Sequence, residues 1–162
     1  DVYKRQHGNE PSHHTTYMYA YSGEHYKIAD KVRYINNELY TDQPDGLSGN
    51  EDCGQMSAWY ILSSMGFYPV NPSNGAYVFG SPLFDEVVLD IPGQKQFKIS
   101  AKNNSDKNIY IQSVSLNGED HKYSYITHKE ILKGGELEFT MGPKPNKDFG
   151  KEKKYRPESI VY

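Results

Sequence analysis

The hydrophobic pattern of this chain changes near residue 70, and the change limits the folds that the chain can adopt. Before that point, apolar residues recur every three or four positions, as they do at Ile28, Val32, Ile35 and Leu39. Beyond residue 76, short runs rich in Val, Ile, Phe and Tyr are separated by Gly, Asn and Asp. The first pattern is typical of amphipathic helices and the second of strands. We therefore predict an α+β fragment, helical over residues 7–70 and forming an antiparallel β-sheet over residues 71–143.

Start and stop signals predict three helices in the first half, over residues 11–22, 24–40 and 50–65. Pro11 suits a first helical turn, and Gly23 and Gly66 suit helix ends. For the third helix, Asn50 is the predicted N-cap, which places two acidic residues in the first turn. The strand pattern predicts six strands, over residues 76–80, 86–91, 96–103, 108–116, 123–128 and 135–142, with a turn at Asn117 and Gly118.

Composition argues against several classes of function. The net charge of -3 over 162 residues provides no basic surface for nucleic acid. The sequence has no run of about 20 apolar residues, so we predict no membrane-spanning helix. Cys53 is the only cysteine, which excludes a disulfide within the chain.

The two ends of the chain differ from the rest. We interpret residues 1–6, DVYKRQ, as foreign or junction residues that precede the first motif. Residues 144–162 are polar and are predicted to form an extended tail. Because the chain opens without an initiator Met or an apolar leader, we interpret it as a piece of a longer protein whose N-terminal part is missing.

Two glycine-bearing acidic segments are the best candidates for chemistry. HGNEP carries Glu10 just before a predicted helix, and GNEDCG carries Glu51 and Asp52 at the start of another. Backbone N–H groups and the helix dipole keep a carboxylate ionised at such a position. An ionised carboxylate suits a general base, or a group that binds a cation or a sugar hydroxyl. The alternative is helix capping, since acidic residues are common in a first turn.

His13 and His14 are weaker candidates. Adjacent side chains on a helix point about 100° apart, so the two cannot bind one metal ion as residues four apart would. A surface location without function is the alternative for this pair.

Two long blocks of the sequence, HGNEPSHHTTYMYAY and GLSGNEDCGQMSAWYILSSMGFYPVNPSNGAYVFGSPLF, resemble the C-terminal part of glycoside hydrolase family 92, the exo-acting α-mannosidases. A third, GGELEFTMGPKPNKDFG, resembles the end of that family's catalytic region, so the likeness runs from His7 to Gly150. The resemblance implies that residues 7–70 belong to an (α/α)6 barrel, which in the family follows an N-terminal β-sandwich. It implies that residues 71–143 are a β-rich C-terminal part of the catalytic region.

The resemblance also implies an inverting, calcium-dependent α-mannosidase that acts on mannose-containing glycans. Asp52 is then the expected general base, with Glu51 or Asn50 orienting the water. Glu10 is expected to bind a sugar hydroxyl, with Asn9 and His13 near the Ca²⁺ or the substrate. Asn9, Glu10 and His13 are thus the expected metal ligands, and Ca²⁺ prefers oxygen donors of the carboxylate and amide kind.

One part of the family's active site has no counterpart in this sequence. The general acid of the family is a glutamate in a block resembling EGNAWQY, upstream of the segment that resembles HGNEP, and no such block occurs here. We therefore expect this chain alone to be inactive and the missing N-terminal part to be its partner. The resemblance implies that the parent protein is secreted, periplasmic or on the cell surface.

Two other functions stay open at this point. A non-catalytic carbohydrate-binding β-domain with a helical extension accounts for the 15 tyrosines but leaves GNEDCG unexplained. Another (α/α)6 carbohydrate-active enzyme, such as a phosphorylase, would need a phosphate site, and no cluster of Lys or Arg stands beside the acidic segments.

Overall fold

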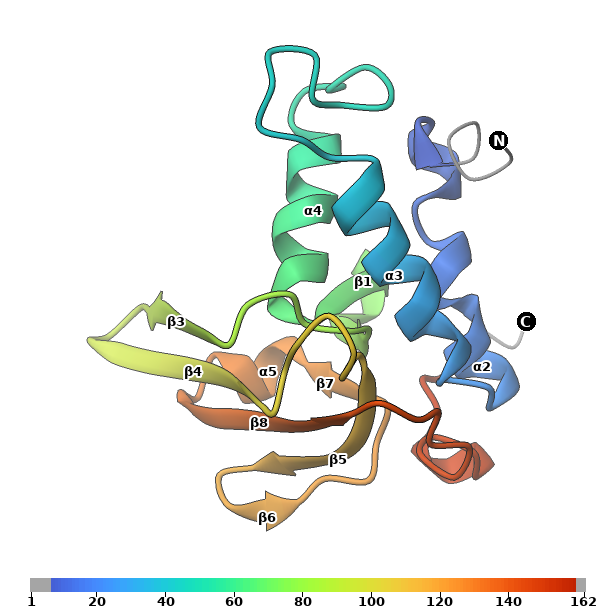
Figure 1. Cartoon of the computed structure of the whole chain (residues 1–162). Helices are drawn as coiled ribbons and strands as arrows, with labels where there is room; N and C mark the ends of the chain where they lie inside the picture. Colours follow the sequence, from blue (N-terminus) through green and yellow to red (C-terminus); the bar gives the residue numbers. More distant parts are fainter. Residues whose placement is uncertain (1–6, 160–162) are drawn as a thin grey trace.

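A computed structural model describes residues 7–159, with helices packed on one side of two β-sheets (Figure 1). The interpretation of residues 1–6 falls outside the described residues, as do the last three residues of the predicted tail. The helical half consists of η1 (Glu10–Ser12), η2 (Thr15–Met18), α2 (Tyr19–Ser22), α3 (Lys27–Glu38) and α4 (Gln55–Met65). No helix among residues 7–159 is long and apolar enough to cross a membrane.

The predicted helix over residues 11–22 is broken into short turns. Two 3₁₀ turns precede a single α-helical turn, α2. Pro11 lacks a backbone N–H donor, and the β-branched Thr15 and Thr16 favour a helix less than straight side chains do, so a continuous α-helix is disfavoured. Gly23, with φ of 81°, ends this segment as predicted.

The second predicted helix is confirmed as α3. It buries one stripe of apolar side chains, and its charged residues Asp30 and Glu38 are exposed on the opposite face. The helix ends at Glu38, two residues before the predicted end, and Leu39 forms its C-cap.

The start of the third helix differs from the prediction. Asp52, Cys53 and Gly54 have φ of 47°, 57° and 94°, and Gly54 is the N-cap of α4. Three successive left-handed residues cannot belong to a right-handed helix. The predicted N-cap at Asn50 and the placement of Glu51 and Asp52 in the first turn are therefore wrong, because both acids lie in the loop before the helix. Gly66 ends α4 as predicted.

The residues after Gly66 form two sheets, so the predicted helical region of residues 7–70 is wrong over residues 67–70, which belong to a strand. β1 (Phe67–Asn71), β2 (Ala76–Phe79) and β7 (Tyr125–Thr127) make an antiparallel sheet in that order. The other sheet has the order β3-β4-β8-β5-β6, formed by β3 (Glu86–Ile91), β4 (Lys95–Lys102), β8 (Gly135–Gly142), β5 (Tyr110–Leu116) and β6 (Glu119–Asp120). Short helical segments η3 (Pro72–Asn74), α5 (His128–Ile131) and η4 (Lys153–Tyr155) complete the fold.

The prediction of a purely antiparallel sheet is wrong at one pairing. β4 and β8 run parallel, from Phe97 beside Gly135 to Lys102 beside Thr140. More than thirty residues separate the two strands, including β5, β6 and β7, so a long crossover makes the parallel pairing possible.

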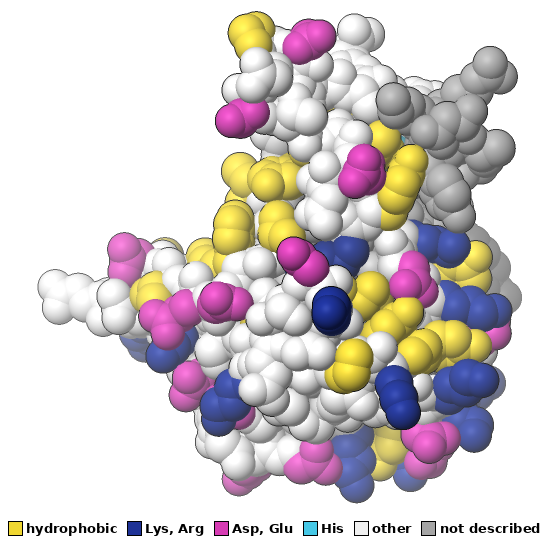
Figure 2. Space-filling view, in the orientation of Figure 1, with side chains coloured by type: hydrophobic (Ala, Val, Ile, Leu, Met, Phe, Trp, Pro, Cys, Tyr) yellow, Lys and Arg dark blue, Asp and Glu magenta, His cyan; other side chains and the backbone are white. Residues whose placement is uncertain are grey.

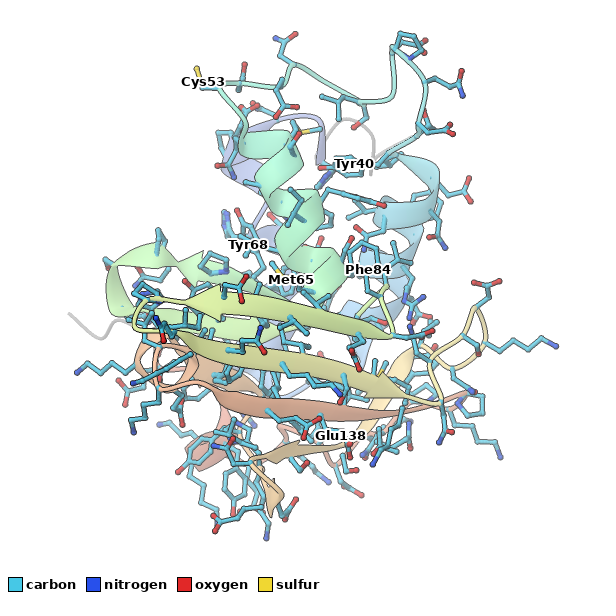
Figure 3. All side chains as sticks on the ribbon, turned by 90° about the vertical axis from the view of Figure 1, so that its left-hand side faces the viewer. Tyr40, Cys53, Met65, Tyr68, Phe84 and Glu138 are labelled. Atoms are coloured by element: carbon cyan, nitrogen blue, oxygen red, sulfur yellow. The ribbon has the colours of Figure 1, made fainter. Side chains whose placement is uncertain are left out.

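Two hydrophobic cores meet at α4. One lies among the helices, around the fully buried Tyr17 and Trp59, and the other fills the sheets, around Phe79 and Phe139. Leu62 on α4 packs against both cores. The end of α4 that holds the acidic loop is therefore the end remote from the sheets, as the positions of Cys53 and Met65 in Figure 3 show.

Residues 144–159 are not an extended tail. This segment folds back on the protein, where Phe149 packs edge-on against His25 with ring centroids 4.9 Å apart. The N–H of Ser124 donates to the carbonyl of Tyr155 at 2.8 Å. A polar composition suggested an extended conformation, but these contacts hold the segment against the turn that follows α2 and against the residue just before β7.

Candidate active site

The two Gly-Asn-Glu segments meet beside the N-terminal end of α4. Gly8 and Gly49, 41 positions apart in the sequence, approach so closely that a Cβ at Gly49 would lie 2.4 Å from the carbonyl oxygen of Gly8. Only glycine permits this backbone contact. The tertiary structure thus brings together the two acidic segments that the sequence singled out.

Glu10 and Asp52 form the centre of this arrangement. Their carboxyl groups share a hydrogen bond, which lowers the pKa of Glu10 and raises the pKa of Asp52. Glu10 is half-buried and Asp52 is exposed. The predicted influence of a helix N-terminus on Asp52 is therefore wrong. Asp52 lies outside the helix, and its pKa responds to Glu10 instead.

Glu51 has a different environment from Asp52. Its Oε1 accepts a hydrogen bond from the backbone N–H of Ser57 at 3.2 Å, and its carbonyl accepts from the N–H of Met56 at 3.3 Å. Glu51 thus caps α4 from the preceding loop, so the capping alternative applies to this acid. Its neighbour Asn50 is exposed. Of the two adjacent acids, Asp52 is the one that points toward the other acidic segment.

His13 is buried beneath the two segments and supports them. Its Nε2 lies 3.0 Å from the carbonyl of His7, and its Nδ1 lies 3.2 Å from Nε2 of Gln55. Because a carbonyl only accepts, Nε2 carries the proton and Nδ1 accepts from the Gln55 amide. Burial lowers the pKa of His13, which favours this neutral form. Gln55 also donates to the hydroxyl of Tyr68 at 3.2 Å.

His7 extends this buried network toward α3 and α4. Its ring stacks on His13 with centroids 4.7 Å apart and meets Trp59 edge-on at 4.2 Å. The Tyr40 hydroxyl donates to the carbonyl of Met56 at 3.1 Å, so its oxygen accepts from Nε2 of His7 at 2.7 Å. Burial, with a contribution from His13, lowers the pKa of His7 to about 3.

Sequence analysis missed most of this supporting network. It named His13, but not His7, Tyr40, Gln55 or Trp59 as part of the site. His7 belongs to one acidic motif and Gln55 directly follows the other, so their positions in the sequence could have marked them as part of the site. Nothing local to Tyr40 or Trp59 indicates that they lie beneath the acidic segments. His14, by contrast, is exposed.

The oxygen atoms of this site suit calcium in type. Asn9, Glu10 and Asp52 provide amide and carboxylate oxygens, the donors that Ca²⁺ prefers. Within residues 7–159, no group of three or more His, Cys, Asp and Glu side chains is placed to hold a metal ion. Both ring nitrogens of His13 have protein partners, so a bond from this residue to Ca²⁺ would have to replace one of them.

The family model for the glycosyl hydrolase family 92 catalytic domain matches residues 2–143 of this chain. Among solved structures, a family 92 α-mannosidase of Bacteroides thetaiotaomicron, in complex with mannoimidazole, is 42% identical with a TM-score of 0.91. That match covers 95% of this chain and 20% of the other. A family 92 inverting mannosidase of the same organism is 42% identical with a TM-score of 0.89, over 95% of this chain and 21% of the other.

A curated relative extends the likeness to a fungus. A protein of Arthroderma benhamiae described as an uncharacterized secreted glycosidase is 33% identical over 138 residues, which are 83% of this chain and 18% of that protein. The chain thus spans about a fifth of the length of the relatives that it matches. The family match covers most of the residues, including both acidic segments, and the chain therefore belongs to glycoside hydrolase family 92.

Proposed function

We propose that the parent protein is an inverting, calcium-dependent α-mannosidase that hydrolyses α-mannosides of glycans, and that this chain supplies one side of its active site. The observation that supports this most directly is the close approach of Gly8 and Gly49, which brings Glu10 and Asp52 together where two segments that both match the family meet. The similar mannosidases of B. thetaiotaomicron support the choice of substrate.

Asp52 is the proposed general base. An inverting glycosidase places its two carboxyl groups roughly 6.5–9.5 Å apart, to leave room for water between the base and the sugar. Glu10 and Asp52 share a hydrogen bond and are therefore too close to be that acid–base pair. The general acid must come from another carboxyl group, which agrees with its proposed origin in the preceding part of the parent protein. This chain alone is then inactive.

The remaining residues bind and orient. Glu10 and Asn9 offer a carboxylate and an amide to sugar hydroxyls or to Ca²⁺, and Asn50 lies in the same loop as the base. Glu51 fixes that loop to α4 through Ser57 and is placed to orient the water together with Asn50. His13 holds the backbone of His7, just before Gly8, and so positions Glu10. When bound, Ca²⁺ would bind mannose hydroxyls and offset the charge of the carboxylates.

We propose further that the helical part of residues 7–70 belongs to an (α/α)6 barrel, with residues 71–143 as its β-rich C-terminal neighbour. The parent acts outside the cytoplasm, as the description of the fungal relative as secreted suggests.

The charge of this region favours hydrolysis over phosphorolysis. Residues 34–94, which include the acidic loop and α4, contain no Lys or Arg, and neither do residues 7–26. Figure 2 shows no Lys or Arg side chain over the upper part of the helical half on the face in view. A phosphorylase must bind phosphate, and these described segments offer it no cationic side chain.

The substitution Asp52→Asn in the full-length parent tests the proposal. Loss of a general base lowers kcat by about 10²–10⁴-fold, while substrate binding changes little. A role limited to holding the loop in place instead lowers stability by about 1 kcal/mol and leaves the turnover of folded enzyme intact. Asp45→Asn, an exposed acid in the same loop, is the matched control. Near-normal kcat of folded Asp52→Asn enzyme would overturn the assignment of the base.

A further inference from the structure

The segment that folds back on the protein, residues 144–156, has a charge opposite to that of the rest of the chain. It contains six cationic and two acidic residues, for a net charge of +4, whereas the whole chain has a net charge of -3. The cationic residues are Lys144, Lys147, Lys151, Lys153, Lys154 and Arg156. The small net charge of the chain therefore hides a basic region.

Most of this positive charge has no acidic partner. Asp148 pairs with Lys151 at 3.3 Å, and Glu152 pairs with Lys154 at 3.1 Å. No carboxylate within residues 7–159 forms an ion pair with the other four cations of the segment. The Arg156 guanidinium donates to backbone carbonyls instead, so its charge is not neutralised.

The lysines of the five-stranded sheet are arranged differently. Lys98 pairs with Glu86 at 2.8 Å, and Lys102 pairs with Glu138 at 2.7 Å, so acids on neighbouring strands neutralise these cations. An uncompensated cluster instead produces a positive potential that attracts anions. Figure 2 shows Lys and Arg side chains gathered over the lower right of the molecule, where Figure 1 places the C-terminal segment.

Tyrosine rings lie among these cations and beside a groove. Nζ of Lys154 is 4.7 Å from the ring centroid of Tyr155, and Tyr155 meets Tyr123 edge-on at 5.5 Å. Tyr123 is 42% exposed. The groove has a volume of about 240 Å³, and its lining includes Tyr155, Gln112 and His121. This region thus combines cations, aromatic rings and hydrogen-bonding side chains.

We propose that residues 144–156, together with Lys122 and Tyr123, form a basic surface that binds an anionic glycan, one that carries phosphate or carboxylate groups. This inference rests on the proposed function in so far as a parent that acts on glycans would meet such a ligand. The candidate active site lies at the end of α4 remote from the sheets, whereas the basic surface lies beside β5. The basic surface would therefore hold the parent on a polymer without taking part in hydrolysis.

The side chains of the basic surface favour a glycan over a membrane. A membrane-binding surface presents side chains such as Trp, Phe and Leu for burial among acyl chains. Among the described large hydrophobic residues that are exposed, only Tyr123 belongs to the basic surface. A tyrosine ring can instead pack against the C–H face of a sugar while its hydroxyl group makes a hydrogen bond.

The charge of the whole chain argues against nucleic acid. A DNA duplex carries one negative charge per about 1.7 Å of its axis, and the acidic remainder of the chain would repel it. A glycan can carry its anionic groups sparsely, so that a small basic surface binds them while neutral sugars lie against the rest of the protein. Lysine and arginine bind phosphate and carboxylate groups through charge-assisted hydrogen bonds.

Binding by the full-length parent tests the proposal. Phosphorylated dextran and carboxymethyl dextran, both sparsely substituted and equal in charge density, are immobilised for biolayer interferometry, with unmodified dextran as the neutral probe. We expect the parent to bind at least one anionic dextran at least about tenfold more tightly than neutral dextran, and high salt to weaken this binding because it screens exposed charges. The comparison of the two anionic dextrans identifies the preferred substituent.

Equal affinity for the neutral and anionic dextrans would overturn the proposal. Tighter binding to a DNA duplex or to vesicles that contain phosphatidylserine than to both anionic dextrans would also overturn it.

Charge-removing variants test the location of the binding surface. The double variant Lys147→Gln, Lys153→Gln removes two exposed cations that have no acidic partner, and Lys98→Gln, Lys102→Gln removes two that have one. Both change the net charge equally. We expect the first pair to weaken binding to the anionic dextran by at least about tenfold and the second to change it little.

Equal losses in the two double variants would show that binding depends on overall charge and would overturn the proposal. Both variants should hydrolyse a small neutral aryl α-mannoside at the rate of the wild type. Failure of this proposal and failure of the α-mannosidase assignment can therefore be distinguished.

Discussion

The contact between Gly8 and Gly49 offers a direct test of how the two acidic segments are positioned. In Gly49→Ala, the new Cβ would lie 2.4 Å from the Gly8 carbonyl oxygen, about 1 Å inside ordinary van der Waals contact. It would also lie 3.0 Å from the carbonyl carbon and Cα of Gly8. All three atoms belong to the backbone, so no side-chain rotation relieves the overlap. The two loops must separate.

The size of the effect follows from this displacement. Glu10 and Asp52 are two and three residues beyond the contact, so a separation of about 1 Å there moves the two groups relative to each other. Such a misplacement can lower the rate by about 10²-fold. Overpacking of this kind lowers stability by about 1–3 kcal/mol. We expect kcat of the full-length parent on an aryl α-mannoside to fall by about 10²-fold, with the enzyme still folded in urea titrations.

Gly93→Ala provides the matched control. Gly93 has φ of 88° and no atom within 4 Å of the Cβ that alanine would add, so the substitution adds backbone strain of about 1 kcal/mol without moving the site. Its turnover per folded molecule should equal that of the wild type. A kcat of folded Gly49→Ala enzyme within about twofold of wild type would refute this reasoning, since it corresponds to less than about 0.5 kcal/mol in activation barrier. The contact between Gly8 and Gly49 would then not be what positions the two acids.

Three further predictions concern stability and metal dependence. Burial lowers the pKa of His25, which lies 2.9 Å from the Phe79 carbonyl, to about 4. The unfolded chain therefore binds a proton more readily than the folded chain. The free energy of unfolding should fall by up to roughly 3 kcal/mol as pH decreases from about 6.5 to 4. Urea titrations of His25→Gln should show a weaker dependence of this free energy on pH. Arg33→Met should lower the free energy of unfolding by about 3 kcal/mol in the same assay. The reason is that the buried guanidinium donates to the Ser81 hydroxyl at 3.0 Å and also to Pro82 and Asn104. The control is Lys98→Met, which removes a partly exposed cation. A chelator should abolish hydrolysis by the full-length parent, and added Ca²⁺ should restore it. Calorimetry should find little or no Ca²⁺ binding to this chain alone, because we expect the rest of the parent to supply part of the ligand set; tight binding would contradict this.

Local signals predicted those elements whose formation depends on neighbouring residues. The spacing of apolar residues located α3, and the short runs rich in Val, Ile, Phe and Tyr located β3, β4 and β8. The Asn117–Gly118 turn is confirmed, with φ of 54° and 83°, because these two residue types tolerate the left-handed region that such a turn requires. The start of α4 was predicted wrongly. A good N-cap residue followed by two acids is also compatible with a loop, and here the helix begins only after that loop.

Residue types and short-range spacing were enough to establish the α+β class and most element positions, and to single out the two acidic segments. The parallel pairing of β4 and β8, the folding back of residues 144–159, and the contact of Glu10 with Asp52 became visible only in the folded chain. The same holds for the difference between Glu51, which caps a helix, and its neighbour, which faces the other acid. Each of these features depends on which distant backbones approach one another, and spacing along the chain does not encode that approach.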